Sequence, residues 1–184
     1  MEILDIVDMD GNPTGKTVDR QTAHREGLLH RTSHVWIVRS KEGRLQVLLQ
    51  KRCRDKDSFP GCYDISSAGH IPAGYDYMES AVRELKEELN VDISPDMLID
   101  CGLIHISFDE IFHGEEFRDR QVSRVFLLKL DMEAEEFTVQ KEEIDEVRWM
   151  DYEECLDSVE NNKIPNCIRT KELKMLEPHF ADVI

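Results

Sequence analysis

Short apolar runs separated by turn-forming residues dominate the first part of the chain. Two extended segments between residues 3 and 19 flank the cluster Asp10, Gly11, Asn12 and Pro13. Clusters of Gly, Pro, Asn and Asp between apolar segments are typical of tight turns, because these residues adopt the backbone angles that a reversal needs. The pattern therefore predicts a β-hairpin at the amino end.

Aliphatic and β-branched runs farther along the chain predict the strands of a sheet. The runs 33–40 and 45–51 are separated by the turn-forming sequence KEGR, which indicates a second hairpin. The other runs expected to be strands are 64–71, 102–108, 122–130 and 142–150. Two polar segments, 55–63 and the charged 109–120, are expected to be loops.

Helical periodicity becomes strong at residues 78–89. With about 100° between successive residues of an α-helix, one stripe of this segment is apolar, and we expect it to face the core. The stripe consists of Met78, Val82, Leu85 and Leu89. Two shorter amphipathic segments, 151–160 and 166–177, are expected to be helices bounded by prolines.

Strands and helices are mixed along the chain, which has no internal repeat, low-complexity linker or break in composition. This mixture favours an α+β fold, an α/β/α sandwich in which a mixed β-sheet lies between helices. The length of 184 residues is slightly above the commonest size of a domain, about 100–150 residues. We therefore expect one domain over residues 1–184, with an N-terminal hairpin and C-terminal helices.

The chain is strongly acidic, since 39 Asp and Glu outnumber 23 Lys and Arg and give a formal charge of −16. This charge opposes broad contact with nucleic acid or an anionic membrane surface. No apolar run approaches the ~20 residues that cross a bilayer, and the amino end lacks the features of a signal peptide. We expect a cytoplasmic protein with a small-molecule partner and reduced cysteines, and a homodimer is the commonest soluble assembly.

Three carboxylates lie on the face of the 78–89 helix away from its apolar stripe. Glu84, Glu87 and Glu88 are close enough that their charges destabilise the helix unless a cation compensates them. Mg²⁺, or Mn²⁺, suits such a cluster, because these ions bind carboxylates and bridge to substrate phosphates. Arg83, four residues before Glu87, is placed to hold a carboxylate. A solvated acidic helix face is the alternative interpretation.

The wider pattern around this helix resembles the Nudix box, Gx5Ex7REUxEExGU, in which U is a bulky aliphatic residue. The matching residues lie at the family's spacing without an insertion: Gly69, Arg83, Glu84, Leu85, Glu87, Glu88 and Val91. Two positions depart from the box. Asn90 replaces the last glycine, and asparagine is expected to adopt the same left-handed conformation that ends a helix. Tyr75 replaces the first glutamate and removes a carboxylate from the loop before the helix.

The resemblance implies a Nudix fold and Mg²⁺-dependent hydrolysis of the pyrophosphate bond in a nucleoside diphosphate derivative or a related diphosphate. Glu84, Glu87 and Glu88 would then be metal ligands, with Arg83 orienting them. In the family, a carboxylate outside the box often serves as a base or a further ligand. Candidates for this role are Glu115, Glu116, Glu142 and Glu143, and we favour Glu143, just before the segment EVRWM.

Several other residues are candidates for substrate binding. A phosphate substrate needs local cations on an acidic protein, and Lys51 and Arg52 lie in a basic cluster that could supply them. Gly69, at the start of the box, is expected to line the substrate site. Phe59 flanks a Pro-Gly turn in a loop that could touch a base or another apolar group, with a core position as the alternative.

Segments outside the box are similar to the Nudix branch that contains isopentenyl diphosphate isomerase. The similar segments are VDR, AHREGLLHR, LLQKR and FPGCYDISSAGH. Histidines bind a metal in those isomerases, and His24, His30 and His70 lie near the matching positions. We prefer a hydrogen-bonding role for His24 and His30, and His70, next to the box glycine, is a candidate metal ligand.

The isomerase reaction is the first alternative to hydrolysis. It needs a proton-transfer pair, which the isomerases supply with a cysteine and a glutamate. Ala68 and Gln121 occupy these positions, and neither transfers protons as required, so we favour hydrolysis. The second alternative is a binding module that has kept the fold and lost catalysis, which the substitution at Tyr75 suggests.

Overall fold

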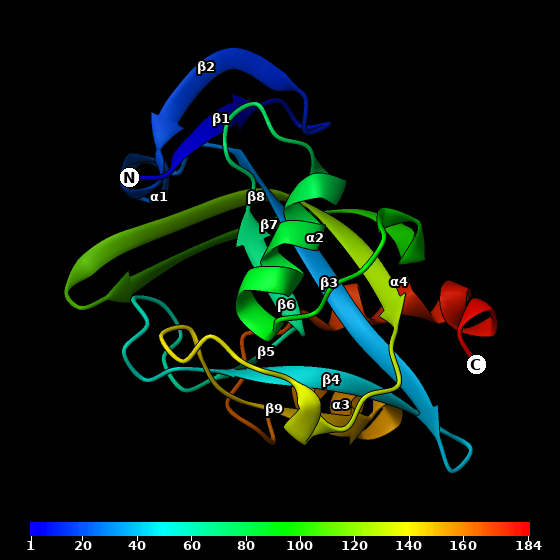
Figure 1. Ribbon diagram of the computed structural model, residues 1–184. Helices are drawn as coiled ribbons and strands as arrows, with labels where there is room; N and C mark the ends of the chain where they lie inside the picture. The colour runs from blue at the N-terminus through cyan, green and yellow to red at the C-terminus, as the bar shows by residue number, and fades with distance from the viewer.

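A β-hairpin opens the chain in the computed structural model, which describes residues 1–184 (Figure 1). Strands β1 (Ile3–Val7) and β2 (Pro13–Asp19) pair antiparallel, as the turn residues predicted. Gly11 adopts a positive φ of 82° in the connection, and a Cβ there would lie 2.5 Å from the hydroxyl of Tyr77. Both observations require glycine at this position.

A mixed sheet of seven strands forms the centre of the molecule. Its strands are β3 (His30–Lys41), β4 (Arg44–Arg52), β5 (Tyr63–Asp64), β6 (Ser67–His70), β7 (Leu98–Phe112), β8 (Glu115–Lys129) and β9 (Ile144–Asp151). Strands β3 and β8 run parallel, and the other pairs are antiparallel. The predicted strands and the prediction of a mixed sheet are therefore confirmed.

The prediction of a loop over 109–120 is wrong. Strand β7 continues to Phe112 and β8 starts at Glu115, so residues 108–119 form a hairpin end, here called the arm, that projects beyond the sheet (Figure 1). Charged side chains pair across β7 and β8 at its base, as Arg120 does with Asp109 at 2.6 Å. A charged segment can be extended when a partner strand satisfies its backbone hydrogen bonds and its side chains reach water.

Helices cover both faces of the sheet, which confirms the predicted sandwich (Figure 1). They are α1 (Arg20–Glu26), α2 (Tyr77–Leu89), α3 (Tyr152–Glu160) and α4 (Thr170–Leu176), with the 3₁₀ turns η1 (Pro95–Met97), η2 (Ala134–Glu136) and η3 (Glu177–Asp182). Side chains of successive residues in β3 point to opposite faces of the sheet. Val35 and Ile37 pack with α2, whereas Trp36 and Val38 pack with α3 and α4. None of the helices has the length and apolar content needed to cross a bilayer.

Helix α2 begins and ends as its sequence indicates. Asp76 caps the amino end by accepting a hydrogen bond from a backbone amide at 2.8 Å. Asn90 ends the helix in the left-handed conformation, at a φ of 54°, as expected. The apolar stripe packs in the core through Met78, Val82, Leu85 and Leu89. This packing fixes the rotation of α2 about its axis, so the acidic positions face β6 and the space beyond it.

Candidate active site

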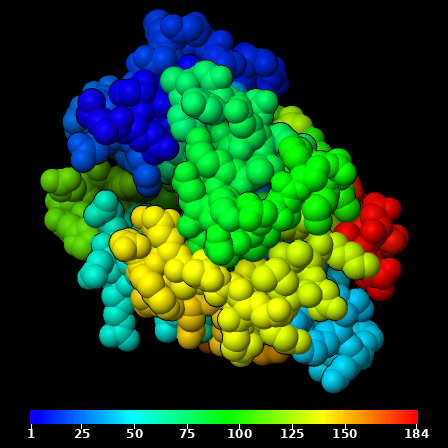
Figure 2. Space-filling model, viewed as in Figure 1, coloured from blue at the N-terminus to red at the C-terminus, as the bar shows by residue number.

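A cavity of about 300 Å³ lies between α2, the arm and the loop 53–62. Figure 2 views the molecule from the side of α2 (green), with this loop (cyan) and the segment after β8 (yellow) beside it. The predicted site residues that line the cavity are Arg52, Phe59, Gly69, His70, Glu84, Glu87, Glu88 and Glu143. Ala68 and Gln121, which the sequence resemblance predicted at the positions of a proton-transfer pair, line it as well. The fold thus gathers residues that are far apart in the sequence.

Gly69 lets β6 approach α2 closely. A Cβ at this position would lie 2.2 Å from the carboxyl carbon of Glu84 and 2.5 Å from its Oε1. The Glu84 side chain therefore occupies the space that any larger residue at 69 would fill. Gly69 lines the cavity, as predicted, and it also leaves the room that the Glu84 carboxylate occupies in the cluster.

Gly69→Ala is expected to lower kcat at least tenfold while the protein stays folded. The added methyl must push the Glu84 carboxylate aside, and a displacement of about 1 Å in a catalytic group is enough for losses of this size. Steady-state kinetics and a thermal melt of the same sample measure the two effects. Gly74→Ala provides the control, since Gly74 is a second glycine near α2 with no atom within 4 Å of an added Cβ, although its positive φ adds strain.

Glu84 and Glu88 are held near each other in a largely buried setting. Glu88 is 7% exposed, and its Oε2 accepts hydrogen bonds from the Ser67 hydroxyl at 2.7 Å and the Ala68 amide at 3.2 Å. Burial raises the pKa of Glu88 to about 8, because desolvation outweighs these hydrogen bonds and Glu84 adds repulsion. Burial also raises the pKa of Glu84. Glu87, whose side chain is 56% exposed, faces the cavity from the rim.

This crowding of carboxylates fits a hard divalent cation. The protein supplies only one cation at the cluster, Arg83, which donates to Glu84 at 2.9 Å and lies 3.9 Å from Glu87. The predicted contact with Glu87 is thus present, and the shorter contact is with Glu84. Arg83 also lies 5.9 Å from the ring centroid of Tyr75, so the residue that replaces the box glutamate still faces the arginine. One arginine can compensate the charge of only one carboxylate, so ionising all three acids calls for a further cation.

Three histidines from different elements meet at the other end of the cavity. The ligand atoms of His24 from α1, His30 from β3 and His70 from β6 all lie within 4.8 Å of one another. Asp119 joins them from β8, with its Oδ1 3.6 Å from His30 Nε2 and 3.8 Å from His24 Nε2. These four residues are called the histidine cluster below. The sequence interpretation preferred a hydrogen-bonding role for His24 and His30, and it did not identify Asp119.

The histidine cluster has the chemistry of a metal site. Burial lowers the pKa of His24 to about 3 and lowers those of His30 and His70, so the imidazoles are neutral and carry a lone pair. The Nδ1 of His30 lies 2.8 Å from the carbonyl of Leu28; donation there leaves Nε2 free to accept. His30 Nε2 and Asp119 Oδ1 are buried without a hydrogen-bond partner. A bound cation would satisfy both atoms.

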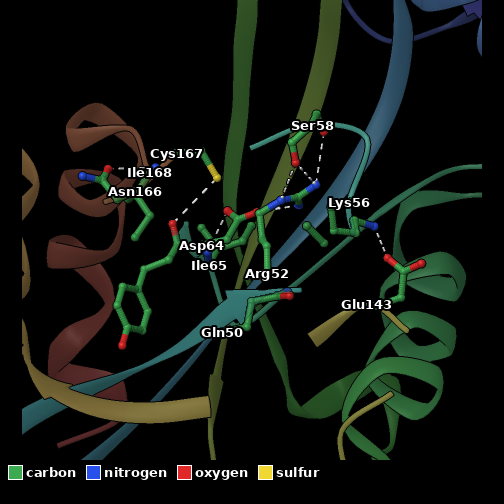
Figure 3. A network of polar contacts seen from close by, with 12 residues as sticks. Gln50, Arg52, Lys56, Ser58, Asp64, Ile65, Glu143, Asn166, Cys167 and Ile168 are labelled. Atoms are coloured by element: carbon green, nitrogen blue, oxygen red, sulfur yellow. Dashed lines mark hydrogen bonds and ion pairs between the residues drawn. The ribbon is translucent and has the colours of Figure 1, made fainter. Parts of the chain in front are cut away.

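Of the two basic residues that the sequence predicted to bind substrate, only one lines the cavity. Lys51 does not line the cavity, because adjacent residues of a strand point to opposite faces, and its amine lies over the ring of Tyr63. Arg52 does line the cavity, but its guanidinium is already engaged (Figure 3). It donates to Asp64 at 3.1 Å and to the Ser58 carbonyl at 3.0 and 3.1 Å. Arg52 thus fixes the loop 53–62.

Glu143 is the one candidate base that the structure brings to the cavity. It forms an ion pair with Lys56, which reaches across from the loop 53–62 (Figure 3). The other three candidates do not line the cavity: Glu115 and Glu116 lie in the arm, and Glu142 is exposed. Of the four candidates, Glu143 therefore remains the predicted base.

A buried ion pair lies in the cavity wall. His34 Nδ1 lies 2.9 Å from Glu172 Oε1, and the same oxygen accepts a hydrogen bond from Trp36 Nε1 at 2.9 Å. Burial disfavours the charged form of His34, but the adjacent Glu172 carboxylate outweighs that effect and raises the pKa of the histidine. Glu172 thereby ties α4 to β3 in the wall of the cavity.

Glu172→Gln is expected to lower the free energy of unfolding at pH 6 by about 2 kcal/mol, the usual worth of a hydrogen bond to a charged group. Because the pKa of His34 is raised above its unfolded value of 6.5, the pair's contribution is full below pH 6.5 and disappears as the pH rises through the folded pKa. Urea unfolding of both proteins at pH 6, 7 and 8 measures this difference. If the two proteins differed by the same free energy of unfolding at all three pH values, His34 would not be charged in the folded protein.

Comparison with known proteins identifies the family. A model described as the NUDIX domain matches residues 28–169. Nudix hydrolase 3 of Arabidopsis thaliana is 42% identical over 160 residues, which cover 83% of this chain and 20% of that protein. A Nudix hydrolase of Clostridium acetobutylicum is 37% identical over 143 residues, 78% of this chain and 66% of that one. This chain belongs to the Nudix hydrolase family, although it spans less than two thirds of the length of either relative.

A solved structure supports the same fold. The DR0079 protein of Deinococcus radiodurans superposes with a TM-score of 0.69 at 22% identity, over 94% of this chain and 98% of that chain. The NUDIX hydrolase of Alicyclobacillus acidocaldarius superposes with a TM-score of 0.57 at 15% identity, over 78% of this chain and 89% of that chain. Together with the matching domain model, this similarity confirms the predicted Nudix fold. Members of the family use a divalent metal ion and act on small-molecule substrates.

Proposed function

We propose that this chain hydrolyses the pyrophosphate bond of a nucleoside diphosphate derivative, with Mg²⁺ held by Glu84, Glu87 and Glu88. One observation carries the proposal: three carboxylates with a single arginine beside them converge on the wall of a cavity. When bound there, the ion neutralises phosphate charge and polarises the bond to the leaving oxygen. Glu88, which is buried, and Glu84, which is partly buried, both have raised pKa values and gain most from such an ion.

The protein's own groups have separate roles in this proposal. Arg83 holds Glu84 and Glu87 in one orientation, so the ligands are set before substrate enters. Glu143 accepts the proton of the attacking water. Lys56 fixes the Glu143 carboxylate at the cavity edge.

The histidine cluster is proposed to hold a second divalent ion. Its donor set of three imidazole nitrogens and one carboxylate suits a transition metal such as zinc or manganese better than magnesium. His24 Nε2 and His70 Nε2 lie 3.3 Å apart, so both can reach one small ion. The two metal sites would share one cavity.

A substrate screen tests the proposed activity. Purified protein is incubated with a panel of nucleoside diphosphate derivatives and with isopentenyl diphosphate, each with and without Mg²⁺, and the products are separated by chromatography. We expect Mg²⁺-dependent release of a nucleoside monophosphate from at least one compound. Conversion of isopentenyl diphosphate to its dimethylallyl isomer would favour the isomerase, and no turnover of any compound would favour a binding module.

A further inference from the structure

Two adjacent parallel strands carry a row of polar side chains on one face of the sheet. The row consists of His30, Thr32 and His34 on β3 and of Asp119, Gln121 and Ser123 on β8. Alternate residues of a strand point to the same face, and the register places Gln121 beside His30. All members of the row except Gln121 are buried. Buried polar groups need hydrogen-bond partners, so the contacts within the row decide how it is held.

Gln121 is held between this row and the histidine cluster. Its Oε1 accepts hydrogen bonds from the hydroxyls of Thr32 at 3.1 Å and Ser123 at 3.3 Å. Its Nε2 donates to Oδ2 of Asp119 at 2.7 Å. An ionised carboxylate only accepts hydrogen bonds, whereas hydroxyls can donate them. This is therefore the one orientation of the Gln121 amide that satisfies all three partners.

The hydrogen-bonded groups behind Gln121 are anchored in the core. Thr32 Oγ1 lies 2.6 Å from Ser123 Oγ and 3.3 Å from His34 Nε2. His34 is in turn held by Glu172 at 2.9 Å. Ser123 is fully buried and Glu172 is 2% exposed, so close packing limits the movement of these groups. The amide of Gln121 is thus fixed by partners that cannot turn away from it.

Gln121 leaves Asp119 with one free oxygen. Its amide engages Oδ2, whereas Oδ1 is buried without a hydrogen-bond partner and lies 3.6 Å from His30 Nε2. Together with the three histidines, Oδ1 makes a set of four ligand atoms. Around a tetrahedral ion with bonds of ~2.0–2.1 Å, neighbouring ligand atoms lie about 3.3 Å apart. The 3.3 Å between His24 Nε2 and His70 Nε2 matches this spacing.

We propose that Gln121 is a positioning residue that raises the selectivity of the histidine cluster for zinc over manganese. This inference rests on the second metal site of the proposed function and narrows the class of ion that it binds. Zinc sites usually have four ligands, which three imidazoles and one oxygen supply. Manganese favours six ligands that are mostly oxygen, so it gains more from both oxygens of a carboxylate. By holding Oδ2, Gln121 keeps Asp119 from binding an ion through both oxygens.

Metal affinity tests the proposal separately from catalysis. Zinc and manganese are each titrated into the metal-free protein against a chromophoric chelator, with excess Mg²⁺ to occupy the carboxylates of α2. Gln121→Met replaces the amide with an apolar side chain of similar length. We expect zinc affinity to fall at least about tenfold, as when a metal ligand loses its hydrogen-bond partner, and manganese affinity to change by less than about threefold. Equal losses for the two ions would overturn the proposal, because a general disturbance of the site weakens both.

A second variant keeps the shape and polarity of the side chain. The carboxylate of Gln121→Glu cannot donate to Asp119, and it offers an ion further oxygens. The ratio of zinc affinity to manganese affinity should therefore again fall at least about tenfold. An unchanged ratio in this variant would overturn the proposal, since the hydrogen bond to Asp119 would then have no influence on the choice of ion.

Gln140→Met is the matched control. Gln140 lines the same cavity, and its hydrogen bonds come from its backbone. The affinity ratio should stay within about twofold in this variant, and a fall as large as that of the Gln121 variants would overturn the proposal. If the unchanged protein bound neither ion, the second metal site and this inference would both fall. A selective loss in the Gln121 variants without hydrolysis of any compound would support the inference and refute the proposed hydrolysis.

Discussion

Glu87→Gln is expected to lower kcat by about 10²–10⁴-fold with little change in the melting temperature. The Glu87 side chain is 56% exposed and makes only a long contact with Arg83, so a neutral amide costs the fold little.

Glu88→Gln should lower kcat as strongly as Glu87→Gln. It should also stabilise the metal-free protein at neutral pH, since burial raises the pKa of Glu88 to about 8 and its charge is therefore unfavourable there. Steady-state kinetics at saturating Mg²⁺ and thermal melts with EDTA measure both effects.

Glu79→Gln supplies the matched control for these variants. Glu79 is an exposed acid in the first turn of the same helix and does not line the cavity. Its replacement changes the net charge of α2 by the same amount and should leave kcat within about twofold. Unchanged activity in both Glu87→Gln and Glu88→Gln would remove the proposed magnesium site. A similar loss in all three variants would trace the effect to the overall charge of the helix.

The sequence was sufficient to predict the structure wherever a feature depends on the spacing of residues within one short segment. The apolar stripe of α2, its cap at Asn90 and the direction of its carboxylates all follow from the period of one helix. The hairpins follow from their turn residues for the same reason. These features involve residues that are neighbours along the chain, so the physical cause of each lies within about twenty residues.

The remainder of the site depends on contacts between distant segments. The histidine cluster joins α1, β3, β6 and β8, and no local pattern indicates that Asp119 points at two histidines. Lys51 and Arg52 are adjacent, and only the pairing of β4 decides which of them faces the cavity. The charge of the arm predicts a loop, whereas its backbone is paired across two strands. That pairing depends on the opposite strand, so the charge pattern of either segment alone does not indicate it.

The two proposed metal sites differ in ways that a chelator can separate. The carboxylates of α2 offer only oxygen, and ions at such sites usually keep several waters. The histidine cluster offers mostly nitrogen and is more deeply buried than Glu87, since His30 is fully buried and Asp119 is 4% exposed. Transition metals bind imidazole far more tightly than magnesium does. Brief treatment with EDTA should therefore remove the ion of α2 first.

His70→Ala is expected to lower the affinity for zinc or manganese at least about 100-fold, because a buried site loses a ligand that water replaces poorly. Metal content after equilibration with zinc and gel filtration, measured by mass spectrometry, should fall by about one ion per chain relative to the unchanged protein. Binding of Mg²⁺ at α2, followed by calorimetry, should persist, since Glu84, Glu87 and Glu88 remain.

Asp119→Asn should have a smaller effect in the same direction, because the amide keeps an oxygen but loses the charge. His113→Asn is the control, since His113 is exposed in the arm and adopts a positive φ that asparagine tolerates. Equal zinc content in the unchanged protein and the His70 variant would show that the histidines are held together by burial alone.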